Sequence, residues 1–175
     1  MRYAYLHGLA SSPQAHKAVA LARALEPKGI TLERPDLNVP SLEKLSLEAM
    51  LGEVDRMAAR SPGELWCLVG SSLGGYVAAY WAERNPSLVR RLLLLCPVID
   101  PGALRPAWST WPASPEVACL TRIVHGTRDE SVPISSSRSY AATRAHVSLL
   151  EVDDDHRLVA STPRIIDEAI AFFGI

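Results

Sequence analysis

The chain has 175 residues, 48% of them hydrophobic, and carries 18 Lys and Arg against 19 Asp and Glu. This length and apolar content predict one domain, residues 1–175, with a sizeable core. The near-neutral charge, without a basic run, argues against a nucleic acid or an anionic membrane as partner, and no apolar run reaches the roughly 18 residues of a membrane span. Three cysteines without tight spacing predict neither a disulfide framework nor a metal site, so we expect a cytoplasmic protein.

The first part of the chain alternates between strand and helix. Residues 3–6 predict a short strand that ends at a Gly, Ser and Pro cluster, and residues 15–25 carry apolar side chains at helical spacing. Residues 30–37 predict a second strand, and residues 40–59 a helix for which Ser41 is an imperfect N-cap. This order is typical of a βαβ unit.

The later strands read as buried on both faces. Residues 65–70 and 91–99 lack polar alternation, and residues 121–126 and 146–152 follow the same pattern. Helical segments lie between them, and residues 163–175 predict a final helix. Six strands alternating with helices predict an α/β three-layer sandwich (α/β/α) with a mostly parallel sheet.

Residues 100–116 interrupt this alternation. Their high proline content disfavours a regular helix, so we expect an irregular, cap-like excursion after a core strand. Trp108 and Trp111 within it are candidates for the wall of a substrate pocket; alternatively, they anchor the segment to the core.

The stretch Gly70-Ser71-Ser72-Leu73-Gly74 fits the pattern G-x-S-x-G between a predicted strand and a predicted helix. In such a nucleophile elbow, Ser72 sits on a sharp turn, and the flanking glycines let strand and helix approach closely. The backbone N–H of Leu73 then points at a developing oxyanion. A glycine-rich turn with serine caps is the alternative, and a Walker loop is excluded because no Gly-Lys-Ser/Thr follows.

A serine nucleophile needs a base and an orienting acid, which follow it in the chain order Ser, Asp/Glu, His in this architecture. Asp129 and His156 each follow a predicted strand, at the edge where open α/β sheets bind ligands. We therefore predict the catalytic residues Ser72, Asp129 and His156. Asp100 is the rival acid, and Asp129 could instead cap a helix.

The loop after the first predicted strand, His7-Gly8-Leu9, is expected to supply the second oxyanion donor. The backbone N–H of Leu9 is the predicted donor and that of Ala10 the alternative. His7 is a candidate for the substrate pocket, although holding the loop is the simpler role. An ordinary turn at the end of a strand would look the same.

With these residues in view, the chain resembles the α/β-hydrolase superfamily, in particular the small YqiA/YcfP-like esterases and, more loosely, retinoblastoma-binding-protein-type serine hydrolases. The resemblance is carried by YLHGLASSP, LVGSSLGGYVAAYWA, HGTRDESVP and DDDHRL. It implies Ser72 as nucleophile, Asp129 as acid, His156 as base and the amides of Leu9 and Leu73 as oxyanion hole. It also implies a minimal fold without the large cap of bigger relatives.

These observations predict a serine hydrolase that acts on a small-molecule ester or thioester without a metal or other cofactor. Two alternatives stay open. The same residues could cleave another bond, as in an amidase, lactonase, perhydrolase or C–C hydrolase. The chain could also be a protein-binding member of the fold, because fold does not fix function.

Overall fold

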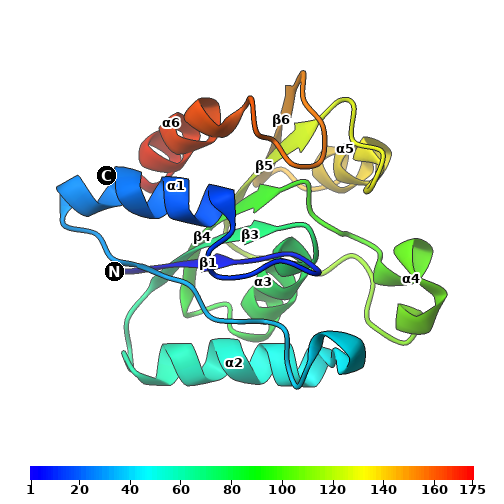
Figure 1. Ribbon diagram of the computed structural model, residues 1–175, viewed down its shortest axis with the longest axis horizontal. Helices are drawn as coiled ribbons and strands as arrows, with labels where there is room; N and C mark the ends of the chain where they lie inside the picture. Colours follow the sequence, from blue (N-terminus) through cyan, green and yellow to red (C-terminus); the bar gives the residue numbers. More distant parts are fainter.

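The computed structural model describes all 175 residues and contains one six-stranded, fully parallel sheet with helices on both faces (Figure 1). The strands are β1 (Arg2–Leu6), β2 (Leu32–Glu33), β3 (Trp66–Ser71), β4 (Val89–Leu95), β5 (Leu120–Gly126) and β6 (Val147–Val152). They lie in the order β2-β1-β3-β4-β5-β6. The predicted three-layer fold is thereby confirmed.

Helices form the two outer layers. They are α1 (His16–Leu25), α2 (Leu47–Ala59), α3 (Leu73–Arg84), α4 (Pro101–Leu104), α5 (Ile134–Ala142) and α6 (Thr162–Phe173), with single 3₁₀ turns η1 (Glu26–Lys28), η2 (Leu42–Lys44) and η3 (Pro106–Trp108). Helices α1 and α6 cover one face of the sheet, and α2, α3 and α5 the other (Figure 1). No helix combines the length and the hydrophobicity needed to cross a membrane.

The continuous apolar sequence of the central strands is explained by their burial on both faces of the sheet. All six residues of β3 are buried, because β3 lies inside the sheet and is covered on both faces. Side chains of β3 and β4 alternate between two hydrophobic cores, one beneath α2 and α3 and one beneath α1 and α6. The continuous hydrophobicity of these strands is the expected pattern for a parallel sheet between two helical layers.

Three predicted boundaries were wrong. Strand β2 contains only Leu32 and Glu33, because it lies at the sheet edge and Pro35 follows closely. Helix α2 begins at Leu47 rather than near residue 40, and its N-cap is Ser46, whose hydroxyl accepts the Ala49 N–H at 3.4 Å. Strand β4 ends at Leu95 rather than residue 99.

The end of β4 has a local cause. Cys96 adopts a left-handed backbone (φ 44°), which side-chain-bearing residues rarely adopt, and Pro97 follows it. The chain therefore turns away from the sheet here. The segment of residues 100–116 then forms the short α4 and η3, so it is less irregular than predicted.

The order of the strands predicts a ligand-binding crevice at the carboxyl ends of β1 and β3. From β1 the chain passes through α1 to β2 on one side, whereas β3 lies on the other side of β1. Open α/β sheets bind ligands where the strand order reverses in this way, outside the carboxyl ends of the strands. The ends of β1 and β3 carry the His7-Gly8-Leu9 loop and Ser72, respectively.

Two glycines allow α3 to pack closely against the carboxyl ends of β1 and β3. A Cβ atom added at Gly74 would lie 2.1 Å from the Leu6 carbonyl oxygen, and one at Gly70 would lie 2.6 Å from the Gly74 carbonyl oxygen. No side chain fits at either position, since real Cβ atoms do not approach within 3.0 Å. The predicted role of the two motif glycines in close packing is therefore confirmed.

We expect Gly74→Ala to lower the free energy of unfolding by about 1–3 kcal/mol or more, because the new methyl group overlaps backbone that cannot move cheaply. The control is Gly52→Ala in α2, where the added Cβ has only Arg56 Nη1 nearby, at 3.7 Å. That variant should gain roughly 0.5–1 kcal/mol from helix propensity. Urea denaturation measures both, and equal effects at the two glycines would contradict the packing argument.

Candidate active site

Ser72 occupies a strained turn between β3 and α3. Its backbone angles are φ 55° and ψ −120°, a conformation that typically costs about 1–3 kcal/mol for a residue with a side chain. Backbone hydrogen bonds hold it there: its N–H donates to Leu95 at 2.9 Å, and its carbonyl oxygen accepts from Gly75 at 2.9 Å and Val98 at 3.2 Å. Ser72 therefore lies between the last residue of β3 and the first residue of α3 and belongs to neither element.

Asp129 and His156 form a hydrogen-bonded pair beside this turn. Nδ1 of His156 lies 2.7 Å from Oδ2 of Asp129. The Asp129 side chain is fully buried, whereas the His156 side chain is 24% exposed. The two residues follow β5 and β6, which are neighbours in the sheet. Because Nδ1 faces the carboxylate, the other ring nitrogen of His156 is free to contact a reacting group.

The Asp129 carboxylate has several further partners. Its Oδ1 accepts the backbone N–H groups of Ser131 and Val132, both at 2.8 Å, and Nε2 of the buried His125 lies 3.2 Å from Oδ2. Burial alone would raise the pKa of Asp129, but the hydrogen bonds with His125, His156 and Val132 outweigh it and hold the pKa well below the usual aspartate range. Asp129 is therefore ionised at neutral pH.

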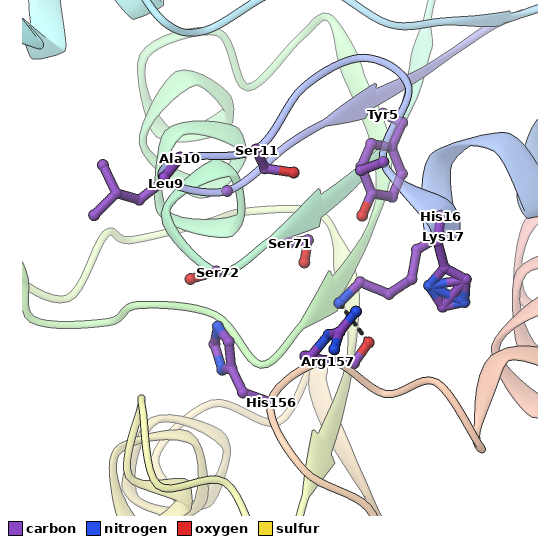
Figure 2. Close-up of a pocket in the computed structure, with 12 residues that line it drawn as sticks. Tyr5, Leu9, Ala10, Ser11, His16, Lys17, Ser71, Ser72, His156 and Arg157 are labelled. Carbon is purple, nitrogen blue, oxygen red and sulfur yellow. Dashed lines mark hydrogen bonds between the residues drawn. The ribbon is translucent and has the colours of Figure 1, made fainter. Parts of the chain in front are cut away.

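Ser72 and His156 line one cavity of about 430 Å³. Figure 2 shows the His156 ring pointing toward Ser72, with the loop that carries Leu9 and Ala10 on the opposite side. The lining residues are Tyr5, Gly8, Leu9, Ala10, Ser11, Ala15, His16, Lys17, Ser71, Ser72, His156 and Arg157. The cavity thus lies between the ends of β1 and β3, at the reversal in strand order.

The loop after β1 lies directly over Ser72. A Cβ atom added at Gly8 would lie 3.0 Å from the Ser72 Cβ. His7 anchors the loop: its Nε2 accepts the Leu37 N–H at 2.9 Å, and Nδ1 lies 2.9 Å from the Gly8 carbonyl oxygen. The backbone N–H groups of Leu9 and Ala10 donate to no acceptor within the protein. Two unused donors therefore stand beside the serine.

The structure does not bring the other predicted pocket residues to this cavity. His7 is buried and directed at Leu37 and Asp36. Trp108 is buried in the core and stacks on Trp111 with ring centroids 4.9 Å apart, so both anchor the segment of residues 100–116. The gain from burying large aromatic rings explains this position.

Asp100 also lies apart from the histidine. Its carboxylate accepts the Ala103 N–H at 3.1 Å and caps α4, while the residue is exposed. The aspartate paired with His156 is Asp129.

Several cavity residues were not predicted from the sequence, including both of its cationic residues, Lys17 and Arg157. Tyr5 belongs to a strand that reads as ordinary core, and Lys17 belongs to the first turn of a helix where a surface lysine is the usual expectation. Tyr5 lies on β1 beside the cavity, and the packing of α1 across the sheet brings Lys17 to it. His125 supports the Asp129 loop, because its Nε2 lies 3.2 Å from Oδ2 of Asp129 and 3.0 Å from the Val132 carbonyl oxygen.

One cluster near the site has the composition of a metal site. The ligating atoms of Cys96, Asp129 and His156 all lie within 4.8 Å of one another. Burial, however, raises the pKa of the Cys96 thiol to about 12, and metal ligation needs the thiolate. Two of the three groups, Asp129 and His156, are hydrogen-bonded directly to each other at 2.7 Å, so in this structure they form a carboxylate–imidazole pair.

The lowered pKa of Asp129 predicts a pH-dependent stability. Ionised Asp129 stabilises the fold above about pH 4, the ordinary pKa of an unfolded aspartate, and this contribution is lost as the pH falls toward the lower folded value. Asp129→Asn should therefore be less stable than wild type at neutral pH, by a margin that narrows between about pH 5 and pH 3. Urea denaturation across this range measures the margin.

Asp153→Asn provides the control for that experiment, because this carboxylate is 87% exposed and pairs only with Arg128. Its stability should follow that of wild type closely at each pH. A margin for Asp129→Asn that stays constant with pH would contradict the role assigned to its charge.

Comparisons with known proteins agree with this architecture. Residues 2–104 match the family described as Uncharacterised protein family (UPF0227). A protein of known structure from Xanthomonas campestris pv. campestris, assigned to the alpha/beta superfamily of hydrolases, is 31% identical; the match covers 99% of this chain and 98% of that one, with a TM-score of 0.83. No curated protein matches the chain in sequence.

More distant structures share the fold. Est1E from Butyrivibrio proteoclasticus, solved with ferulic acid bound, is 16% identical, with a TM-score of 0.83 over 99% of this chain and 89% of that one. Mouse alpha/beta hydrolase domain-containing protein 10 is 20% identical, with a TM-score of 0.83 over 98% of this chain and 89% of that one. The chain therefore belongs to the UPF0227 family and has the fold of the α/β-hydrolase superfamily.

Proposed function

We propose that this protein is a serine hydrolase that cleaves carboxylic esters or thioesters of small to medium acyl groups through an acyl-enzyme on Ser72. The observation that carries the proposal is the hydrogen bond between His156 and the buried Asp129, on the wall of the cavity that also contains the strained Ser72. A serine hydroxyl is a weak nucleophile until such a base removes its proton.

Acylation begins when His156 accepts the Ser72 proton and the hydroxyl oxygen attacks the carbonyl carbon. Asp129 fixes the imidazole through Nδ1 and stabilises the imidazolium that forms. The fully buried carboxylate has fixed hydrogen bonds from Ser131 and Val132, so it holds the ring without reorganising. His156 then gives the proton to the departing alcohol or thiol.

The developing oxyanion is stabilised by backbone N–H groups. Leu73 is the first residue of α3, where an N–H has no partner within the helix and the helix dipole favours negative charge. The second donor comes from the loop after β1, where the N–H groups of Leu9 and Ala10 are both unused. One such donor is typically worth roughly 10²–10³ in rate.

Deacylation repeats the chemistry with water as the nucleophile. His156 takes a proton from water, the oxygen attacks the acyl-enzyme, and Ser72 leaves with the proton returned by His156. The carboxylic acid is released, and the site is restored. These steps use the side chains named above, two amides and water.

Labelling with a fluorophosphonate serine-hydrolase probe tests the nucleophile. Wild type should label, and Ser72→Ala should not. The neighbouring Ser71→Ala is the matched control: it removes a hydroxyl from the same cavity and should keep labelling. Folded wild-type protein that stays unlabelled, or labelling that persists in Ser72→Ala, would refute the proposal.

The two aspartates give a second test. Asp129→Asn should lower kcat by about 10³–10⁴, because the amide cannot hold the imidazole in the required tautomer or stabilise its charge. Asp100→Asn should remain near wild type, since Asp100 only caps α4. Hydrolysis of a 4-nitrophenyl ester measures both rates; equal losses in the two variants would argue against Asp129 as the acid.

A further inference from the structure

The cavity beside Ser72 is lined by groups that favour negative charge. Lys17 and Arg157 are its cationic residues, and hydroxyl groups come from Tyr5, Ser11, Ser71 and Ser72. No aspartate or glutamate lines it. An ester pocket selective for a plain hydrocarbon chain would be mainly apolar, so this lining indicates a different specificity.

Lys17 is the central group. Its side chain runs along the cavity toward Arg157 in Figure 2, and Nζ donates one hydrogen bond, at 3.0 Å, to the Arg157 carbonyl oxygen. An ammonium has three donors, so two remain for a ligand. Lys17 forms no ion pair, and burial lowers its pKa. A bound anion would restore the stabilisation that this ammonium loses on burial.

The nearby carboxylates are engaged elsewhere. Asp129 is paired with His156, and Asp154 accepts the backbone N–H groups of Asp155 and Ser161 at 2.8 and 2.7 Å. Asp155 accepts the N–H of Arg157 at 2.8 Å. These carboxylates act on Lys17 only through space, where their charges raise its pKa against the effect of burial. None of them hydrogen-bonds to Lys17, and the Arg157 guanidinium makes no hydrogen bond or ion pair within the protein, so the donors of both cations are available to a ligand.

Two neutral features add to this environment. Tyr5 is buried, its hydroxyl points into the cavity in Figure 2, and burial raises its pKa to about 12, so it stays a neutral donor. Helix α1 begins at His16, with Ala15 and His16 both on the cavity wall and no acidic residue in its first turn. The positive end of the α1 dipole therefore also faces the cavity.

We propose that this cavity is a subsite for an anionic group, a carboxylate or a phosphate, and that the protein's substrate is an ester or thioester carrying such a group within reach of Lys17. The proposal rests on the proposed serine-hydrolase function and names the substrate class of that site. Lys17 acts here in binding and specificity, whereas Ser72 and His156 carry out the bond cleavage.

Two matched pairs of esters test the proposal with the charge on either side of the scissile bond. On the acyl side, the mono-4-methylumbelliferyl ester of adipic acid is compared with 4-methylumbelliferyl heptanoate, a neutral ester of similar length. On the alcohol side, 4-acetoxybenzoate is compared with its methyl ester. In at least one pair, wild type should show a kcat/KM about ten-fold or more higher for the anionic member.

Lys17→Met should lower that ratio of kcat/KM values about ten-fold, and Lys17→Arg should keep most of it because the charge remains. Lys17→Met also removes the hydrogen bond from Nζ to the Arg157 carbonyl oxygen. Any structural effect of that loss applies to both esters of a pair, so it cancels in the ratio of their kcat/KM values. Lys28→Met, which removes an exposed charge in η1, is the control and should leave the ratio unchanged. No preference in either pair, or a preference that survives Lys17→Met, would overturn the subsite.

Free phosphate and free adipate, added as competitors against 4-methylumbelliferyl heptanoate, identify the anion. Tighter competition by phosphate assigns a phosphate group, and tighter competition by adipate assigns a carboxylate; Lys17→Met should weaken either one. Competition that this variant leaves unchanged counts against the subsite. Hydrolysis that survives Ser72→Ala refutes the serine mechanism instead, so the two failures are distinguishable.

Discussion

The close contact of α3 with the ends of β1 and β3 determines where every other part of the site lies. Because Gly74 has no side chain, the helix rests on the backbone of Leu6 and His7, and Gly70 lets the preceding strand pass beneath it. The turn between strand and helix must then be short, which forces Ser72 into its strained conformation. The loop after β1 passes over the serine, where Gly8 lies close to Ser72.

The electrostatics of the site follow from the order of the strands. Strands β5 and β6 are neighbours, so the loops after them bring Asp129 and His156 together at the edge where Ser72 stands. A buried carboxylate is costly unless it is hydrogen-bonded, and the Asp129 loop meets this need with two backbone N–H groups and two histidines. The partners that stabilise the charge therefore also fix the direction of the imidazole.

The sequence predicted the architecture well because its signals are local and redundant. Apolar strands, the glycines around Ser72 and the position of Asp129 and His156 after strands all indicate the same sheet edge. It predicted boundaries less well. The helix expected from residue 40 begins at Leu47, because both Ser41 and Ser46 are suitable N-cap residues and the sequence pattern does not distinguish between them. The roles proposed for Ser72, Asp129 and His156 remain predictions that geometry supports.

The pocket walls could not be predicted from the sequence, because they depend on long-range packing. Trp108 and Trp111 read equally well as pocket or anchor, and the stacking of Trp111 on Tyr76, with centroids 6.0 Å apart, favours the anchor. Lys17 and Tyr5 give no signal in the sequence, because one resembles a surface lysine and the other a core residue. Their shared position arises only when α1 lies across the sheet beside the end of β1.

In this chain, the proposed substrate selectivity would come from elements close to the sheet rather than from a large cap. In the segment of residues 100–116, the aromatic side chains pack against α3, away from the crevice, so this segment contributes no residue to the cavity wall. The wall opposite His156 therefore comes from the first loop and the start of α1. Because these elements also supply the unused N–H groups beside Ser72, Lys17 and the second oxyanion donor of the proposed mechanism belong to one continuous segment, residues 8–17.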